Sequence, residues 1–155
     1  MRIHPLIPTL ALSLGLALAA LAASGCGMVA YTVRHGFSAP PASEFGLGPR
    51  TSALGAYVAT IETDAPLRTG ALQRVRLSVR DAKGAPIRGA KVTVDGGMPQ
   101  HGHGLPTRPV VTRTLGNGDY VVEGLKFQMG GWWQVYLDIE AAGQHDKATY
   151  NLRLE

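Results

Sequence analysis

The chain has 155 residues and a single cysteine, Cys26. One cysteine can form no internal disulfide, and it excludes a cluster of thiolates that would hold a metal ion. Runs of lysine and arginine are absent as well. Residues 26–155 carry a net charge of only about +3, because Arg2 is the one charged side chain before Cys26. Nucleic-acid binding needs a basic patch with aromatic residues in it, so we expect no nucleic-acid partner.

Catalytic motifs are missing too. No Gly-x-Ser-x-Gly elbow presents a nucleophile, and no His-Glu-x-x-His pair is present for zinc. The carboxylates Asp95, Asp119, Glu123 and Asp138 stand where turns or exposed strand faces commonly carry charge. We therefore expect a protein that is not an enzyme.

The first 25 residues have the composition of a secretory signal. A basic start with Arg2 is followed by an apolar run from about Leu6 to Ala23, and small residues end this run before Cys26. The apolar run is also just long enough for a spanning helix, so a retained anchor helix is the alternative. The small residues favour cleavage by a peptidase.

The stretch "LAASGC" resembles the lipobox of bacterial lipoproteins, with Cys26 at the position that receives a diacylglycerol and Ala23 where a larger aliphatic residue is usual. The resemblance implies a protein of the cell envelope that faces the periplasm and is attached to a lipid membrane through acylated Cys26. Gly27 stands where an aspartate would retain such a lipoprotein at the inner membrane, which favours the outer membrane in a Gram-negative cell. A free thiol after an ordinary cleavage site is the alternative.

Residues 26–55 are rich in Gly, Ala, Ser and Pro without a sustained hydrophobic period, which predicts a flexible linker. As a random coil this linker would span roughly 30 Å. Residues 56–155 are long enough to form one domain with its own core. The expected division is therefore a signal at 1–25, a lipidated cysteine and linker at 26–55, and a folded domain at 56–155.

Alternation of apolar and polar residues recurs along the folded part and indicates strands. In one of them Arg74, Arg76 and Arg80 share a face, which we interpret as solvated. Tyr120, directly after Asp119 at the start of a late strand, is a candidate for a tyrosine corner, the alternative being a plain cross-strand aromatic residue. About seven short strands without a long amphipathic helix predict an all-β, immunoglobulin-like antiparallel β-sandwich. The expected strands are 57–62, 71–80, 87–95, 110–115, 120–127, 132–141 and 147–155.

Four motifs make the folded part similar to the YtkA-like and FixH-like domains of bacterial exported and membrane-anchored proteins. They are "GAPIRGAKV", "MPQHGHG", "GNGDY" and "KFQMGGWW". The similarity covers nearly the whole folded part. It implies an immunoglobulin-like sandwich without a catalytic role, and an association of some relatives with copper transport or oxidase assembly.

The loop "GGMPQHGHGLPTRP" (96–109) carries the candidate site. Side chains two residues apart on an extended segment point the same way and lie about 6 to 7 Å apart, so His101 and His103 can face one metal ion. Met98 offers a thioether, and Met129 offers another if the two loops share one end of the sandwich. Imidazole with thioether favours copper, particularly cuprous copper. Its affinity should fall below about pH 6, where imidazoles become protonated.

Other interpretations of this loop stay open. The imidazoles can fix an irregular loop by donating to backbone carbonyls, while the methionines with Trp132 and Trp133 fill the end of the core. The sandwich would then be a structural or interaction protein that contacts another envelope protein. A ligand other than a transition metal is the third possibility. His145, in a polar turn, is expected to be exposed to solvent.

Overall fold

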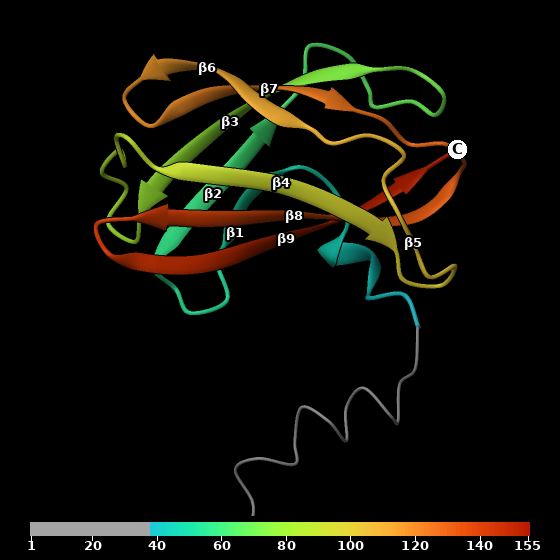
Figure 1. Ribbon diagram of the computed structural model, residues 1–155. Coiled ribbons are helices and arrows are strands. Elements are labelled where there is room, and N and C mark those ends of the chain that lie inside the picture. The colour runs from blue at the N-terminus through green and yellow to red at the C-terminus, as the bar shows by residue number, and fades with distance from the viewer. Residues whose placement is uncertain (1–37) are drawn as a thin grey trace, which may run out of the picture. The chain divides into compact units, whose positions relative to one another are not determined.

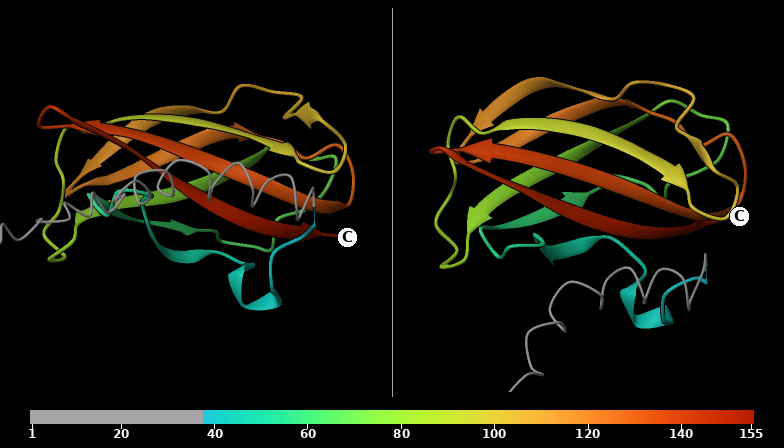
Figure 2. Two further views of the ribbon diagram at one scale, coloured as in Figure 1. Left: turned by 90° about the horizontal axis from the view of Figure 1, so that it is seen from below. Right: turned by 60° about the horizontal axis from the view of Figure 1, so that its bottom comes forward.

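The computed structural model describes residues 38–155, which form nine strands in two antiparallel sheets (Figure 1). One sheet has the order β1-β2-β3-β7-β6, and the other has the order β5-β4-β8-β9. Figure 2 shows the two layers from other directions. The expected all-β antiparallel sandwich is therefore confirmed. The strands are β1 Gly48–Thr51, β2 Tyr57–Glu62, β3 Gln73–Asp81, β4 Lys91–Met98, β5 His103–Gly104, β6 Val110–Gly116, β7 Asp119–Leu125, β8 Gly131–Ala141 and β9 Gln144–Leu154.

Two of these strands, β1 and β5, have no counterpart among the seven segments that the alternation predicts. They contain four and two residues, so neither is long enough to show a period. Each is a strand because it pairs with a longer neighbour, β1 with β2 and β5 with β4. Strands of this kind are defined by tertiary pairing and leave no pattern in the sequence.

Part of the predicted linker has regular structure. Residues 42–51 fall within the predicted linker, yet they form the 3-10 helix η1 (Ala42–Glu44) and strand β1. Phe45 lies beside Asn151 of β9, and the Gly46 N–H donates to the Asn151 carbonyl at 2.8 Å. Contacts with β9 and β2 fix this segment, and its composition does not reveal them.

No helix within residues 38–155 is long and apolar enough to cross a bilayer.

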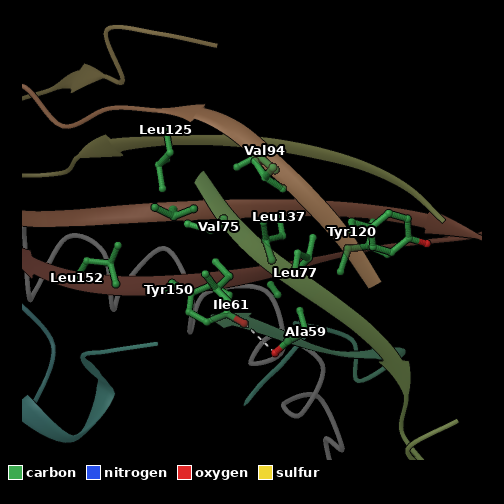
Figure 3. Close-up of a cluster of buried hydrophobic side chains, with 14 of the residues drawn as sticks. Ala59, Ile61, Val75, Leu77, Val94, Tyr120, Leu125, Leu137, Tyr150 and Leu152 are labelled. Carbon is green, nitrogen blue, oxygen red and sulfur yellow. Dashed lines mark hydrogen bonds between the residues drawn. The ribbon is translucent and has the colours of Figure 1, made fainter. Parts of the chain in front are cut away.

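The core lies between the two sheets and follows the alternation of the sequence. Strand β3 buries Val75, Leu77 and Val79 between residues that face outward. Leu137 and Leu152, from β8 and β9, meet this layer from the opposite sheet (Figure 3). Apolar area removed from water contributes about 25 cal/mol per Å², so this layer is the main source of stability. Among the described residues, the buried side chains of the core come from residues 57–154, and they belong to one compact unit.

The outer face of β3 is polar, as the sequence predicts. Arg74 and Arg76 make ion pairs at 2.7 and 2.9 Å while their side chains stay 63% and 61% exposed. Arg80, which is half-buried, pairs with Asp119 at 2.7 Å. Exposed pairs of this kind contribute about 0–1 kcal/mol, so these arginines solubilise the sheet face and add little stability.

Buried tyrosines connect the two sheets through hydrogen bonds to backbone. Tyr150 of β9 donates to the Ala59 carbonyl of β2 at 2.7 Å (Figure 3). Burial raises the pKa of the Tyr150 phenol well above its ordinary value, so the hydroxyl remains a donor throughout the accessible pH range. Tyr57 of β2 donates to the Ala141 carbonyl at the end of β8, at 2.9 Å. Both bonds cross from one sheet to the other.

Tyr120 braces the connection that crosses between the sheets. Its hydroxyl donates to the Ile87 carbonyl at 3.2 Å and accepts from the Ala90 N–H at 3.0 Å. Ile87 and Ala90 lie in the segment between β3, in one sheet, and β4, in the other. The expectation that this phenol bonds to backbone at an inter-sheet crossing is confirmed.

Asp146 of β9 is a buried carboxylate that holds the turn between β1 and β2. It accepts hydrogen bonds from the backbone N–H groups of Leu54, Ala56 and Lys147 at distances between 2.8 and 3.1 Å. Burial alone would raise the pKa of Asp146, but the Ser52 side chain and these backbone donors favour the charged form and hold the pKa below its usual value. The carboxylate thus connects the turn between β1 and β2, in one sheet, to β9 in the other.

We expect Asp146→Asn to lower the free energy of unfolding by about 1–3 kcal/mol, because the amide cannot accept all of these backbone bonds. The folded-state pKa lies below the unfolded value of about 3.9. The contribution of the carboxylate is therefore present above that value and is lost as the pH falls through the folded pKa. Acid should accordingly destabilise the variant less than the wild type. Urea unfolding at about pH 7 and about pH 3 measures both effects.

The matched control for this prediction is Asp64→Asn, whose side chain is 83% exposed and pairs only with Arg76. Its stability should change by less than about 1 kcal/mol. Equal stability of Asp146→Asn and the wild type near neutral pH would show that the carboxylate does not hold the turn.

Candidate metal site

A tight hairpin between β4 and β5 positions the two candidate imidazoles. Strand β4 ends at Met98, and the Met98 carbonyl accepts from the N–H groups of His101 and Gly102 at 3.1 and 2.9 Å. Gly102 has a φ of +69°, which glycine adopts without strain. The chain then returns as β5, with His103 opposite Met98.

Two glycines at the end of β4 allow this hairpin to form. A Cβ on Gly96 would lie 2.5 Å from the Gln134 carbonyl oxygen of β8, and a Cβ on Gly97 would lie 2.9 Å from the His103 carbonyl oxygen. Any side chain at these positions would therefore push the neighbouring backbone away. The bare backbone lets β4 pair with β8 on one side and with β5 on the other.

The imidazole rings of His101 and His103 lie side by side. Their centroids are 5.8 Å apart with an angle of 39° between the ring planes. Two rings that share one ion through metal–nitrogen bonds of about 2.0–2.1 Å have centroids roughly 5 to 6 Å apart, so the observed spacing fits a shared ion. The extended segment assumed from the sequence is absent: His101 lies in the turn and His103 in β5, so the turn, and not strand alternation, brings the rings together.

His103 is held from two sides. Its ring is half-buried and meets the edge of Trp133 at a centroid distance of 5.7 Å. Its Nδ1 atom lies 3.0 Å from Gln128 Nε2 and 3.3 Å from the Gly104 carbonyl oxygen. Metal-binding histidines commonly donate from the nitrogen that does not face the ion, and the acceptor fixes the tautomer and the ring orientation. The Gly104 carbonyl is such an acceptor, whereas the Gln128 amide nitrogen is a donor, so a bond from Gln128 to Nδ1 goes with the opposite tautomer, in which Nε2 carries the proton. A proton on Nδ1 that is donated to Gly104 would leave the lone pair of Nε2 for a metal.

Gln128 is the residue that sequence reasoning misses. It belongs to the loop between β7 and β8 and reaches His103 across 25 positions of the sequence. It also lies 3.4 Å from the Gly104 carbonyl. No periodicity or motif spacing marks it, although it stands directly before Met129. Its contact with His103 shows that the loop 126–130 and the hairpin with the two imidazoles lie at the same end of the sandwich. Met129 could act as a ligand only if this were so.

The two candidate thioethers have different surroundings. Met98 is 2% exposed and lies in the core, where its Cε occupies space left free by Gly131: a Cβ on Gly131 would be 2.7 Å away. Residues opposite each other in an antiparallel pair share a face, so Met98 and His103 are cross-strand neighbours. Met129 is 41% exposed, and its carbonyl accepts from the Trp133 indole at 3.0 Å. Met129 is thus the thioether that solvent can reach.

Histidine and methionine are the candidate metal ligands at this hairpin, without a third histidine, cysteine or carboxylate beside them in the described part of the chain. Within residues 38–155 no three His, Cys, Asp or Glu side chains come together as a metal site. His145 lies in β9 and not in the turn that the sequence predicts, because the turn is confined to residues 142–143. Its side chain is 65% exposed, and its Nε2 lies 3.5 Å from Asp138 Oδ1. Its expected exposure is confirmed. Cys26, the predicted lipidation site, lies outside the described residues.

Trp132 and Trp133 both pack at this end of β8 and do not point together at the imidazoles. Trp133 is fully buried and lies against Phe127 and His103. Trp132 is on the other face, where its indole donates to Asn151 at 3.0 Å. Trp133 is therefore the indole positioned to shield an ion at His103.

A family model described as YtkA-like matches residues 52–138, more than half of the chain. The matched range contains strands β2 to β7 and most of β8, so it includes the imidazole pair and both methionines. No curated protein matches the chain.

The different burial of the two methionines predicts different effects of their removal. Met98→Ala should lower the free energy of unfolding by about 2–5 kcal/mol, because it leaves a cavity in the core. Met129→Ala should change it by less than about 0.5 kcal/mol, because the side chain is partly solvated. Urea unfolding of the metal-free protein compares the two. If the two variants were equally stable, the assignment of Met98 to the core would be wrong.

Proposed function

Because the chain belongs to the YtkA-like family, we propose that it is an exported, lipid-anchored, non-enzymatic module that binds copper in the cell envelope or hands it on. His101 and His103 are the nitrogen ligands, and the thioethers of Met98 and Met129 complete the donor set. The resemblance to FixH-like domains belongs to the same proposal. The single observation that carries it is the pair of imidazole rings with centroids 5.8 Å apart on one hairpin.

The chemistry of the donors supports copper over harder cations. Calcium and magnesium prefer carboxylate and carbonyl oxygen, and the hairpin supplies two imidazoles instead. Thioether sulfur is a soft ligand that favours cuprous copper. His101 and Met129 are both exposed, which gives an ion a path from solvent to the imidazole pair.

An alternative function is supported by the packing of the same residues. Met98 is buried at 2% exposure, and His103 packs against Trp133. In this alternative the imidazoles only stabilise the hairpin, and the sandwich serves as a structural or interaction protein that contacts another envelope protein. The two functions differ in what happens when both imidazoles are removed.

The envelope location rests on the N-terminal sequence. Cys26 is the only cysteine and follows a signal-like segment in a lipobox-like context. Acylation would anchor the module to a lipid membrane facing the periplasm, and Gly27 favours the outer membrane in a Gram-negative cell. More than one acyl chain is needed for stable anchoring, at about 0.8 kcal/mol per buried methylene, and the lipobox implies a diacylglycerol.

We expect the purified protein to bind about one copper ion, and His101→Ala with His103→Ala to weaken this binding at least a hundredfold, because each imidazole contributes a metal–nitrogen bond. Cuprous titration under anaerobic conditions with a competing chelator measures the affinity. His145→Ala is the matched control, since it removes an exposed imidazole that lies away from the hairpin.

Failure of the wild type to bind copper would overturn the metal function. Thermal unfolding of the metal-free double variant then tests the alternative. A purely structural role predicts a clear drop in melting temperature without metal, whereas ligands at a solvent-facing site can be removed with little effect. An unchanged melting temperature would count against the structural role.

The anchor is tested separately by Cys26→Ser. We expect the wild type to partition with membranes and to carry a mass increase at its N-terminal residue that corresponds to acylation. The variant should lack that modification, because serine has no thiol to receive the diacylglycerol. Mass spectrometry of the membrane fraction measures this, and an unmodified Cys26 in the wild type would refute lipidation.

A further inference from the structure

Three basic side chains that make no ion pair among the described residues lie in the loops at one end of the sandwich. This end consists of the loops 66–72, 99–109 and 126–130, and we call it the histidine end. Arg68, Arg108 and Lys126 lie in these loops, and none of them makes an ion pair within the described part of the chain. Elsewhere in the described part, the arginines on the outer face of β3 are neutralised by carboxylates. Basic residues without an ion pair also occur outside this end, among them Lys83, Arg88 and Arg113.

Backbone contacts place these three residues around the end of β7. The Gln73 side chain bonds the Arg68 N–H and carbonyl at 2.7 and 2.9 Å, which ties Arg68 to the start of β3. Gln73 pairs with Leu125, and Lys126 follows directly. The Arg108 carbonyl oxygen lies 3.6 Å from the Cβ position of Gly124. The positive charges therefore belong to one region, where β3, β6 and β7 meet the loops. Glu155 is an acidic residue beside it, because its backbone contacts Thr69 and the Cβ position of Gly130.

Large apolar side chains are exposed at the same end. Leu72 is 69% exposed, Val110 is 55% exposed and Met129 is 41% exposed. Val110 lies opposite Glu123 of β7, and Leu72 lines a surface groove with Glu123 and Gly124. Basic and apolar side chains thus share one surface, a combination typical of segments that rest on anionic membranes.

The described chain also begins at this end. A row of paired residues crosses the second sheet from Phe45 through Asn151, Gln134 and Gly97 to Gly104. Phe45 therefore lies at the same level along the strands as β5. Figures 1 and 2 agree, because the cyan segment that starts at residue 38 lies at the same end as β5 and the C-terminal end of β9.

We propose that the histidine end is a docking surface for an anionic lipid bilayer. The three basic side chains contact the headgroups, and Leu72, Val110 and Met129 contact the boundary of the acyl region. The described chain begins at this end, and this supports docking only if Cys26 is lipidated as proposed. The basic charge and the exposed apolar side chains support docking without that assumption. Docking in this orientation would hold the imidazole pair at the membrane surface, where a membrane-bound partner can exchange a metal with it.

The experiment uses residues 38–155, which belong to one compact unit that holds the buried core described above, without metal and with a chelator present. Flotation with phosphatidylcholine vesicles, with and without phosphatidylglycerol, measures the partition coefficient. We expect binding to the anionic vesicles that weakens with salt. The triple variant Arg68→Ala, Arg108→Ala and Lys126→Ala should lower the partition coefficient about a hundredfold, because each basic residue near an anionic surface contributes roughly fivefold.

A matched triple variant, Lys83→Ala, Arg88→Ala and Arg113→Ala, changes the net charge by the same amount at positions outside the histidine end. Its partition coefficient should fall by less than about threefold if docking is oriented. Leu72→Ser should weaken binding, whereas Leu115→Ser, at a side chain that is 53% exposed outside these loops, should not. Far-ultraviolet circular dichroism confirms that each variant is folded before its partitioning is interpreted.

Two outcomes would overturn the proposal. If the partition coefficient fell equally in the two triple variants, the protein would be attracted to the vesicles by its net charge, without a preferred orientation. If the protein showed no preference for anionic vesicles at low salt, the histidine end would not be a lipid-docking surface, and a protein partner would be the remaining candidate for it. Neither outcome depends on copper binding or on Cys26, so failure here is distinguishable from failure of the proposed function.

Discussion

The close approach of three backbones at Gly96 and Gly97 is the constraint on which the histidine end depends. With a Cβ at either position, the carbonyl oxygen of Gln134 or of His103 would have to move. With glycine, β4 keeps its partner β8 and gains β5 on its free edge. That pairing fixes the path of the loop, and the loop path fixes the separation of the imidazoles and the contact of His103 with Trp133. The local chemistry is therefore set by the absence of two side chains.

The sandwich achieves its inter-sheet connection without a disulfide. Many immunoglobulin-like domains link their sheets through a cystine packed against a tryptophan, and the only cysteine here precedes the described residues. In this domain, hydrogen bonds between side chains and the backbone connect the two sheets instead of a disulfide. Tyr150 joins strands of different sheets, and Tyr120 joins β7 to the connection that crosses between the sheets. Asp146 joins the turn between β1 and β2 to β9. Such bonds form only when both sheets are in place, so they reinforce the cooperativity of the apolar core.

The sequence predicts most of the fold because strand alternation is a local property. Leu77 and Val79 point inward because residues two apart share a face, whatever the rest of the chain does. The short strands β1 and β5 are not predictable in this way, since pairing with distant residues defines them. The same limit applies to the candidate site. The spacing of His101 and His103 predicts their proximity, although a turn produces it, whereas Gln128 reaches His103 only through tertiary packing.

The unequal burial of the two methionines has a consequence for oxidative damage. Oxidants convert thioethers to polar sulfoxides, and exposed sulfur reacts first. Met129, at 41% exposure, would therefore be modified well before Met98, at 2%. A sulfoxide at Met129 would face water and change the stability of the fold little. A sulfoxide at Met98 would place a polar oxygen in the core against Gly131 and destabilise the fold. Oxidation should therefore reach Met129 first and leave the packing of the core unchanged.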